Sequence, residues 1–340
     1  MLTPLRSPRP AAPGWVSDLV QDVIGPRLHE AVDRLPYSVR ELVGYHLGWL
    51  EEPGEPAGST GKLIRPTLTL LSAAAVGSPV QRAADAAVAI ELVHNYALLH
   101  DDVMDGALLR RHRDTVWWRY GMPKAILAGN ALVALGMELL AGQPAAVSIL
   151  CAAVREMVDG QGLDVTLEER SGVTVGECLV AAGGKTAALL RCACELGALY
   201  GEGLTTQVRA LSRFGWHLGM AYQLTDDLLG IWGNPRATGR APLSDLRAGK
   251  KTLPVVAALQ AGGPDSAELA ELYQRPEPLD DEDLLRVAVL IERSGGRRWA
   301  RAEAERQCRS ALACLGAADP AEDAYAALTA LATGLVERDG

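Results

Sequence analysis

The chain has 340 residues, of which 49% are apolar, and a formal net charge of −9 at pH 7. This apolar content is enough for a large core, and the negative charge argues against nucleic acid or an anionic membrane surface as the main partner. An anionic substrate is compatible with the charge, because metal ions reverse the sign of a local site.

Helical periodicity recurs along the chain, whereas strand signals are almost absent. Residues 1–14 carry four prolines and no apolar core, so we expect a flexible tail there rather than a signal peptide. For residues 15–340 we predict one all-α domain of about a dozen helices. The expected helices are Val16–Arg34, Ser38–Trp49, Leu63–Ala75, Val80–Asp105, Pro123–Ala141, Ala145–Gln161, Thr174–Leu199, Leu204–Trp232, Leu253–Gln260, Ser266–Gln274, Asp281–Ser294, Arg297–Cys314 and Pro320–Leu335.

The sequence gives no sign of a membrane span or of a disulfide framework. No strongly apolar run free of charge reaches the length of a span. The six cysteines form no CxxC pair, and no histidine completes a zinc set. We therefore expect free thiols in a cytoplasmic protein.

The first acidic cluster ends the helix expected over Val80–Asp105. Asp101 and Asp105 are four residues apart and share one helix face, with Asp102 beside them. Carboxylate oxygens are ligands that Mg²⁺ prefers, usually together with water and substrate phosphates. Taken alone, the cluster also fits a helix end whose carboxylates face water.

Two arginines follow this cluster, after a glycine that can stop the helix. Gly106 suits a C-terminal cap, and Arg110 and Arg111 come four residues later. These guanidiniums fit either ordinary surface ion pairs or bidentate binding of phosphate groups.

A second acidic pair, Asp226 and Asp227, lies in another apolar helix about 125 residues downstream. A segment rich in glycine and cations follows it, containing Arg240, Asp245 and Lys250. Such a segment is suited to covering a phosphate, although a solvated turn is the simpler alternative.

In their order along the chain these motifs resemble the trans-isoprenyl diphosphate synthase (polyprenyl synthetase) family. Each motif is weak by itself, but seven in the same order are specific. They are Gly61-Lys62-Leu63-Ile64-Arg65-Pro66, Glu91 to Asp105, Arg110-Arg111, Gly160-Gln161 with Asp164, Lys185-Thr186, Tyr222 to Asp227, and Asp245 to Thr252.

The resemblance implies an isoprenoid synthase fold with a central cavity, a homodimer and three Mg²⁺ ions in each active site. It implies that an allylic diphosphate binds through Mg²⁺ to Asp101, Asp105 and Asp226, assisted by Asp102 and Asp227. Arg110, Lys185, Arg240 and Lys250 would add positive charge around it. Isopentenyl diphosphate would bind to Lys62, Arg65, His94 and Arg111, and Lys185, Thr186, Tyr222 and Gln223 would lie near the allylic cation.

The same resemblance gives an expected product length. Tyr96 and Ala97 precede Asp101 by five and four residues, about one helical turn. One aromatic residue with a small neighbour resembles short-chain synthases, with Tyr96 as the floor of the tunnel. We favour a C20 product, geranylgeranyl diphosphate, over the C15 farnesyl diphosphate.

The chain departs from the family at Gly230, where a third aspartate of the second motif is usual. We therefore expect weaker metal binding by the second cluster. Two alternatives stay open: a terpene cyclase on the same helices, and a non-catalytic subunit that regulates a partner synthase. His100 is expected to be structural.

Overall fold

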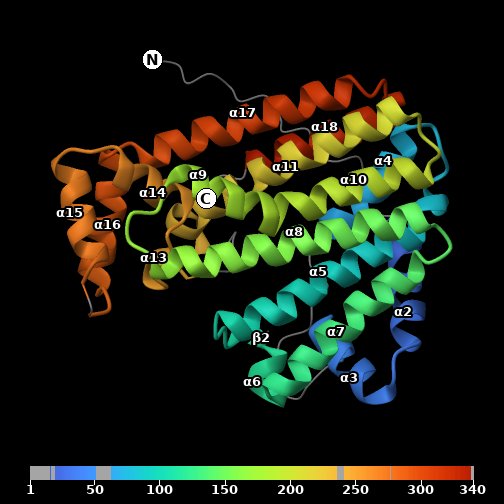
Figure 1. Cartoon of the computed structure of the whole chain (residues 1–340), viewed down its shortest axis with the longest axis horizontal. Helices are drawn as coiled ribbons and strands as arrows, with labels where there is room; N and C mark the ends of the chain where they lie inside the picture. The colour runs from blue at the N-terminus through green and yellow to red at the C-terminus, as the bar shows by residue number, and fades with distance from the viewer. Residues whose placement is uncertain (1–15, 17–19, 51–62, 236–240, 276, 338–340) are drawn as a thin grey trace.

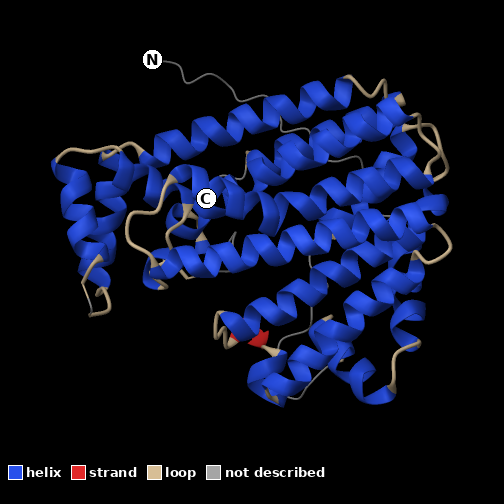
Figure 2. Ribbon diagram, in the orientation of Figure 1, coloured by secondary structure: helices blue, strands red, loops and turns tan. Residues whose placement is uncertain are grey.

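Helices form nearly all of the part of the chain that the computed structural model describes, residues 16, 20–50, 63–235, 241–275 and 277–337 (Figures 1 and 2). The prediction of an all-α fold is confirmed. The elements are η1 (Val20–Ile24), α2 (Gly25–Asp33), α3 (Tyr37–His46), α4 (Ile64–Ala75), η2 (Val80–Ala83), α5 (Ala84–Met104), β1 (Leu109–Arg110), β2 (Arg113–Asp114), α6 (Val116–Tyr120), α7 (Met122–Leu139), α8 (Pro144–Glu169), α9 (Val175–Ala182), η3 (Gly183–Ala187), α10 (Ala188–Tyr200), α11 (Thr205–Trp232), α13 (Ser244–Arg247), α14 (Leu253–Gln260), α15 (Pro264–Tyr273), α16 (Asp281–Arg293), α17 (Gly296–Gly316) and α18 (Glu322–Val336).

Helix α5 lies in the interior and carries the first acidic cluster at its C-terminal end (Figure 1). It packs against α4, α7 and α10. Most of its residues as far as Leu99 are apolar and buried, which is the pattern of a helix within a larger core, and Glu91, His94 and Asn95 are the polar residues among them that are at least partly buried. The carboxylates therefore come where this helix emerges from the core.

The largest apolar cluster joins α4, α5, α8, α10, α11 and α18. Leu71, Ile90, Leu150, Leu190 and Phe214 are buried members of it. Across the other side of α5, a second cluster joins this helix to α2, α3 and α7, so α5 is anchored from two directions.

The end of α5 is fixed by a Schellman motif, as the glycine after it predicts. Gly106 has a φ of 62°, its N–H donates to Val103 O (3.4 Å), and the Ala107 N–H donates to Asp102 O (3.0 Å). The motif stops the helix one residue after Met104 and turns the chain toward the arginine pair.

Two features depart from the elements predicted from the sequence. The helix expected over Thr174–Leu199 is divided by η3, a π-helix, into α9 and α10. In addition, residues 109–114 form a small antiparallel hairpin, with Leu109 opposite Asp114 and Arg110 opposite Arg113. Its two turn residues, Arg111 and His112, have positive φ values of 53° and 66°.

Helix α7 is long and apolar enough to cross a membrane by length and composition, and it is the one such helix among the described residues. Only 33% of it is buried. Met122, Ile126 and Leu127 are among its exposed apolar side chains. This single helix does not establish a membrane span.

Close backbone contact at glycine holds α10 against α4. A Cβ on Gly197 would overlap the carbonyl oxygen of Thr69 and lie 2.9 Å from the Cβ of Ser72. Gly334 in α18 is the matched contrast, because nothing lies within 4 Å of a Cβ there.

We expect Gly197→Ala to lower the free energy of unfolding by ~1–3 kcal/mol, because α10 and α4 must move apart. In contrast, Gly334→Ala should raise it by up to ~1 kcal/mol through helix propensity. Urea unfolding of both variants checks this pair, and equal stabilities would contradict it.

Candidate active site

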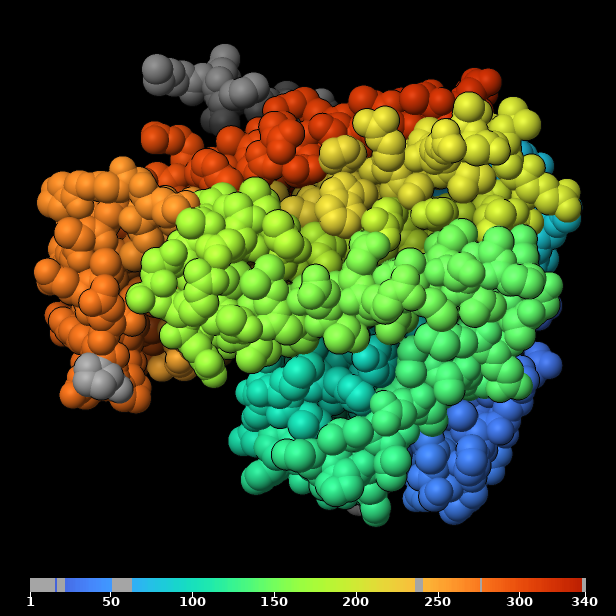
Figure 3. Space-filling view, viewed as in Figure 1, coloured from blue at the N-terminus to red at the C-terminus, as the bar shows by residue number. Residues whose placement is uncertain are grey.

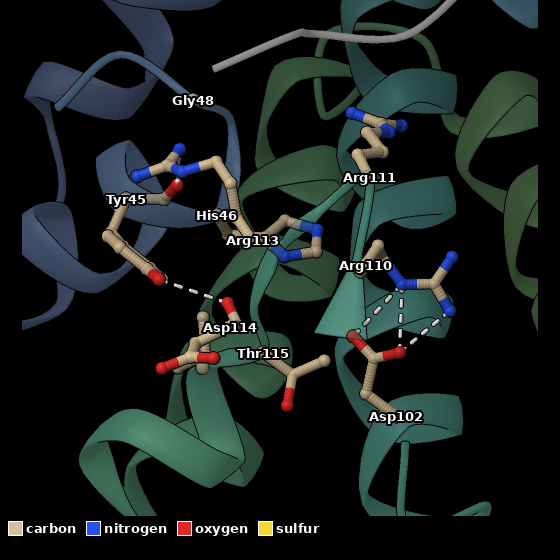
Figure 4. Close-up of a pocket in the computed structure, with 10 residues that line it drawn as sticks. Tyr45, His46, Gly48, Asp102, Arg110, Arg111, Arg113, Asp114 and Thr115 are labelled. Carbon is tan, nitrogen blue, oxygen red and sulfur yellow. Dashed lines mark hydrogen bonds and ion pairs between the residues drawn. The ribbon is translucent and has the colours of Figure 1, made fainter. Parts of the chain in front are cut away.

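In each of the two acidic pairs, one aspartate accepts hydrogen bonds from other residues of the chain. In α5 this residue is Asp102, which is 1% exposed. The Arg110 side chain forks onto it, with Nε 2.8 and 3.0 Å from the two carboxylate oxygens and Nη2 2.7 Å from Oδ1 (Figure 4). Burial raises the pKa of Asp102, and the Arg110 hydrogen bonds oppose that shift.

In α11 the corresponding residue is Asp227. Its Oδ1 accepts a hydrogen bond from Gln223 Nε2 (2.7 Å), and its Oδ2 accepts one from the backbone N–H of Leu253 (3.0 Å). Thr186 Oγ1 in turn donates to Gln223 Oε1 (2.6 Å). Burial raises the pKa of Asp227 to about 7, against the effect of these hydrogen bonds.

The first aspartate of each pair is less enclosed. Asp101 and Asp226 are partly exposed, as is the Asp105 side chain at 34%. Burial raises the pKa of Asp101, and the positive charge of Lys185 opposes the shift. The arrangement therefore separates carboxylates that brace the fold, Asp102 and Asp227, from carboxylates that a ligand can reach.

The π-helix η3 positions Lys185 and Thr186 on different neighbours. Lys185 Nζ forms an ion pair with Asp164 Oδ2 of α8 (2.7 Å), whereas Thr186 contacts Gln223 of α11. The contact with α8 depends on Gly160, because a Cβ there would lie 2.7 Å from Gly184 Cα. Burial acts to lower the pKa of Lys185, but Asp164 and Asp101 outweigh it and the pKa is raised.

A lysine connects the end of α5 with the segment that follows α11. Lys250 Nζ lies 3.2 Å from Asp105 Oδ2 at the end of α5. The Lys250 backbone N–H donates to Asp245 O (2.9 Å) in the segment after α11. At this end of the molecule the surface is indented between the orange helices α15 and α16 and the teal segment after α5 (Figure 3).

A pocket rich in arginine adjoins the first acidic cluster (Figure 4). It is lined by Tyr45, His46, Gly48, Asp102, Arg110, Arg111, Arg113, Asp114, Thr115 and Val116. Arg113 is structural: it donates to the carbonyl oxygens of Tyr45 (3.2 Å) and Leu50 (3.0 Å) and stacks over the Tyr45 ring. Arg110 and Arg111 are the other guanidiniums of the lining, and the positive φ of Arg111 directs the two side chains differently.

His46 is a pocket residue that the sequence did not reveal. Burial, followed by the charges of Arg110 and Arg111, lowers its pKa to about 3. Its Nε2 is buried without a hydrogen-bond partner among the described residues. No local motif distinguishes this histidine at the end of α3 from any other residue of an amphipathic helix.

A buried polar group lies between α4 and α5. Arg65 Nη1 and His94 Nε2 are 3.1 Å apart, and Asn95 Nδ2 donates to Glu91 Oε1 (2.9 Å). Burial lowers the pKa of both Arg65 and His94, and it raises that of Glu91 to about 7. His94 is therefore neutral, and its Nε2 accepts a hydrogen bond from Arg65 Nη1, because a guanidinium can only donate.

Tyr96 stands beside His100, with 4.7 Å between ring centroids in an edge-to-face arrangement. His100 Nε2 lies 3.2 Å from the Ile126 carbonyl oxygen of α7, which agrees with a structural role. Tyr96 and Ala97 both pack against the central apolar cluster. Burial and the charge of Asp101 raise the pKa of Tyr96, so its hydroxyl is within electrostatic reach of the first cluster.

The structure thus brings most of the predicted site residues to one end of the bundle, in two groups. One group surrounds the carboxylates: Asp101, Asp102, Asp105, Asp226, Asp227, Lys185, Thr186, Gln223 and Lys250. The other lies toward α4 and the hairpin: Arg65, His94, Arg110 and Arg111. Tyr222 lies one turn before Asp226 on α11. Lys62 and Arg240 fall outside the described residues.

Comparison with known proteins identifies the family. Residues 48–290 match the polyprenyl synthetase family. The chain belongs to this family. Farnesyl and geranylgeranyl diphosphate synthases of Mycobacterium tuberculosis are 44% and 42% identical to it over 300 and 302 residues. These alignments cover 86% of this chain, and 84% and 85% of the two relatives.

Structural comparison agrees with the assignment. The crystal structure of a polyprenyl synthetase from Streptomyces coelicolor A3(2) matches with a TM-score of 0.89 and 44% sequence identity. The match covers 94% of this chain and 98% of the other. The predicted family is confirmed, and the predicted activity of a short-chain trans-prenyltransferase agrees with the names of the relatives.

The residues of this family member fit Mg²⁺ as the metal. Their exposed donors are carboxylate oxygens, which are hard ligands. Within the described ranges no group of three or more His, Cys, Asp or Glu side chains is placed to hold an ion alone. This is compatible with an ion that takes part of its coordination shell from a diphosphate and water.

We expect Glu91→Gln to remove a pH dependence of stability. The wild-type carboxyl has a pKa of about 7 when folded, compared with ~4.3 when unfolded. Between these values the folded state binds more protons, so wild-type stability falls as pH rises. The Gln variant should gain ~1–3 kcal/mol relative to wild type from pH ~4.5 to ~7. Parallel pH profiles in urea unfolding would contradict this expectation.

Proposed function

We propose that this chain is a Mg²⁺-dependent trans-prenyltransferase that condenses isopentenyl diphosphate with an allylic diphosphate. The product that we favour is the C20 diphosphate, with C15 as the alternative. Three Mg²⁺ ions per active site follow from the family resemblance.

Two neighbouring anion sites of different chemistry carry the proposal. One is lined by carboxylates and binds an anion through metal ions. The other is lined by guanidiniums and binds an anion directly. The Asp102–Arg110 pair joins them. A reaction between two diphosphates needs both sites, whereas ionisation of a single diphosphate needs one.

In this proposal, the allylic diphosphate lies at the carboxylate site. Asp101, Asp105 and Asp226 hold the metal ions, and Asp102 and Asp227 assist by fixing their elements. Lys185 and Lys250, already within ion-pair distance of Asp164 and Asp105, turn to the diphosphate when it enters. Arg110 and, outside the described residues, Arg240 add further positive charge.

Isopentenyl diphosphate lies at the guanidinium site, bound by Arg65, His94 and Arg111, with Lys62 from the undescribed segment before α4. The buried neutral His94 suits hydrogen bonding to a phosphate oxygen rather than ion pairing. Because these donors are buried and poorly solvated, the free energy needed to desolvate them when an anion binds is small.

The chain's own residues then prepare carbon–carbon bond formation. Bound Mg²⁺ supplies Lewis-acid stabilisation of the departing diphosphate. Lys185 and Lys250 stabilise the same negative charge, while Thr186, Tyr222 and Gln223 direct oxygen atoms or dipoles toward the allylic cation. The homoallylic double bond attacks that cation, and a proton is lost, with the departing diphosphate as its proposed acceptor. Exclusion of water protects the cation from hydrolysis.

A second copy of the chain is proposed to cover α7 and the adjoining face of α8. Exposed apolar side chains gather on both helices, including Ile126 and Leu127 on α7 and Val158 and Val165 on α8. A homodimer would remove this apolar area from water. A cytoplasmic location is part of the same proposal.

The two alternatives make different demands on the site. A terpene cyclase needs no guanidinium site, so retention of Arg65, His94 and Arg111 opposes it. A regulatory subunit need not keep its carboxylates, yet five of the six family aspartates are present. Gly230 is the residue that favours either alternative.

We expect purified protein with Mg²⁺ and labelled isopentenyl diphosphate to elongate C5, C10 or C15 allylic diphosphates to C20. EDTA should abolish the reaction, because the carboxylates cannot bind the diphosphate without a cation. Thin-layer chromatography of the dephosphorylated products measures this. Hydrocarbon released from an allylic diphosphate alone would indicate the cyclase, and no turnover would indicate the subunit.

We expect Tyr96→Ala to lengthen the product, because the side chain proposed as the tunnel floor is shortened. Tyr325→Ala on α18, where the tyrosine is exposed, is the control that should keep the wild-type product. Chain lengths determined by mass spectrometry decide the point. An unchanged product in Tyr96→Ala would remove Tyr96 as the floor.

A further inference from the structure

The space beside Gly230 is filled by a side chain from outside its own helix. It lies four residues after Asp226, so the two positions share one face of α11. A Cβ built on Gly230 would overlap the carboxylate group of Asp245. The space that a side chain would use at this position is therefore filled by an acid from a different element.

The segment that carries Asp245 is fixed against α11. Leu243 has a left-handed φ of 56° and starts the short helix α13. Ser244 Oγ donates to the Gly230 carbonyl oxygen (3.3 Å), and Leu246 is buried in an apolar cluster with Ile231. These contacts on both sides of Asp245 determine where its carboxylate lies.

The segment that carries Asp245 also contains the lysine that pairs with the first acidic cluster. Lys250, which pairs with Asp105, donates its backbone N–H to Asp245 O. Asp245 thus lies against α11 at Gly230 and is linked to the end of α5 through Lys250.

We infer that Asp245 provides the third carboxylate of the second metal cluster, which it reaches through the volume that Gly230 leaves. This rests on the proposed function, because the cluster is a metal site only if the chain binds a diphosphate through cations. Gly230 is then required by this arrangement and is not simply the loss of an aspartate, because a Cβ at position 230 would displace the Asp245 carboxylate. In this arrangement Asp101 and Asp105 of α5, together with Asp226 and Asp245, would hold the metal ions.

The test is calorimetric titration of the full-length protein with inorganic pyrophosphate at a series of Mg²⁺ concentrations. We expect Asp245→Asn to raise the Mg²⁺ concentration for half-maximal binding at least about tenfold. Gly230→Ala should also raise this Mg²⁺ concentration. It keeps Asp245, but the added Cβ displaces the Asp245 carboxylate from its position. Asp323→Asn, an exposed acid in α18, is the control and should leave binding unchanged.

The decisive variant moves the carboxylate back to the helix. Gly230→Asp combined with Asp245→Ala should lower the Mg²⁺ concentration for half-maximal binding to near the wild-type value. This double variant tests the inference even if one of the single variants fails to fold. Failure of this double variant to recover, with a wild-type unfolding temperature, would overturn the inference. Unchanged or tighter pyrophosphate binding by Asp245→Asn would also overturn it. If the Asp245 carboxylate binds no metal ion, its removal only reduces the electrostatic repulsion of pyrophosphate.

The readout separates this inference from the proposed function. A wild-type protein that binds pyrophosphate with Mg²⁺ but elongates nothing would contradict only the proposed reaction. A wild-type protein that elongates, with Asp245→Asn unchanged in Mg²⁺ dependence, would contradict only the role of Asp245.

Discussion

Carboxylates buried where apolar helices leave the core impose the constraint on which the other features of the site depend. A charge removed from water must be given a partner, or its pKa moves until the charge is lost. In α5 the partner is the Arg110 fork on Asp102. In α11 it is the Gln223 amide and the Leu253 N–H on Asp227. Each contact also fixes a second element, the hairpin in one case and α14 in the other, so the acidic residues organise the loops around them.

The same constraint explains why cations converge from three directions. Lys185 comes from η3, Lys250 from the segment after α13, and Arg65 from α4. Lys185 and Lys250 form ion pairs with Asp164 and Asp105. In the proposed reaction, a diphosphate with its metal ions would bring both signs of charge at once, so it would exchange for these partly exposed pairs without leaving a charge unpaired.

The sequence predicted most of the helices, the end of α5 and the family, because these depend on local patterns, whereas the short helices α6 and α13 were not predicted. Apolar periodicity, the glycine after Asp105 and the ordered motifs are all visible in the chain itself. The hairpin was missed because its turn uses Arg111 and His112 at positive φ instead of the usual Asn-Gly or Asp-Gly. The π-helix was missed because its one-residue bulge has no periodic signature. His46 and the contact between Gly230 and Asp245 were out of reach for a different reason: they are produced by segments that meet only after folding.

The π-helix η3 has a consequence for how the chain can vary. Lys185 and Thr186 are adjacent, yet the widened turn directs one to α8 and the other to α11. Removal of one residue from Gly183–Ala187 would restore an ordinary helix and leave α10 with nearly its present rotation about the helix axis, because the widened turn accommodates one extra residue locally. The small residues of α10 that face α4, Gly197 among them, would keep their contacts. The deletion would change only the positions of Lys185 and Thr186, so the extra residue of the π-helix bears on the candidate site and leaves the helix packing unaffected.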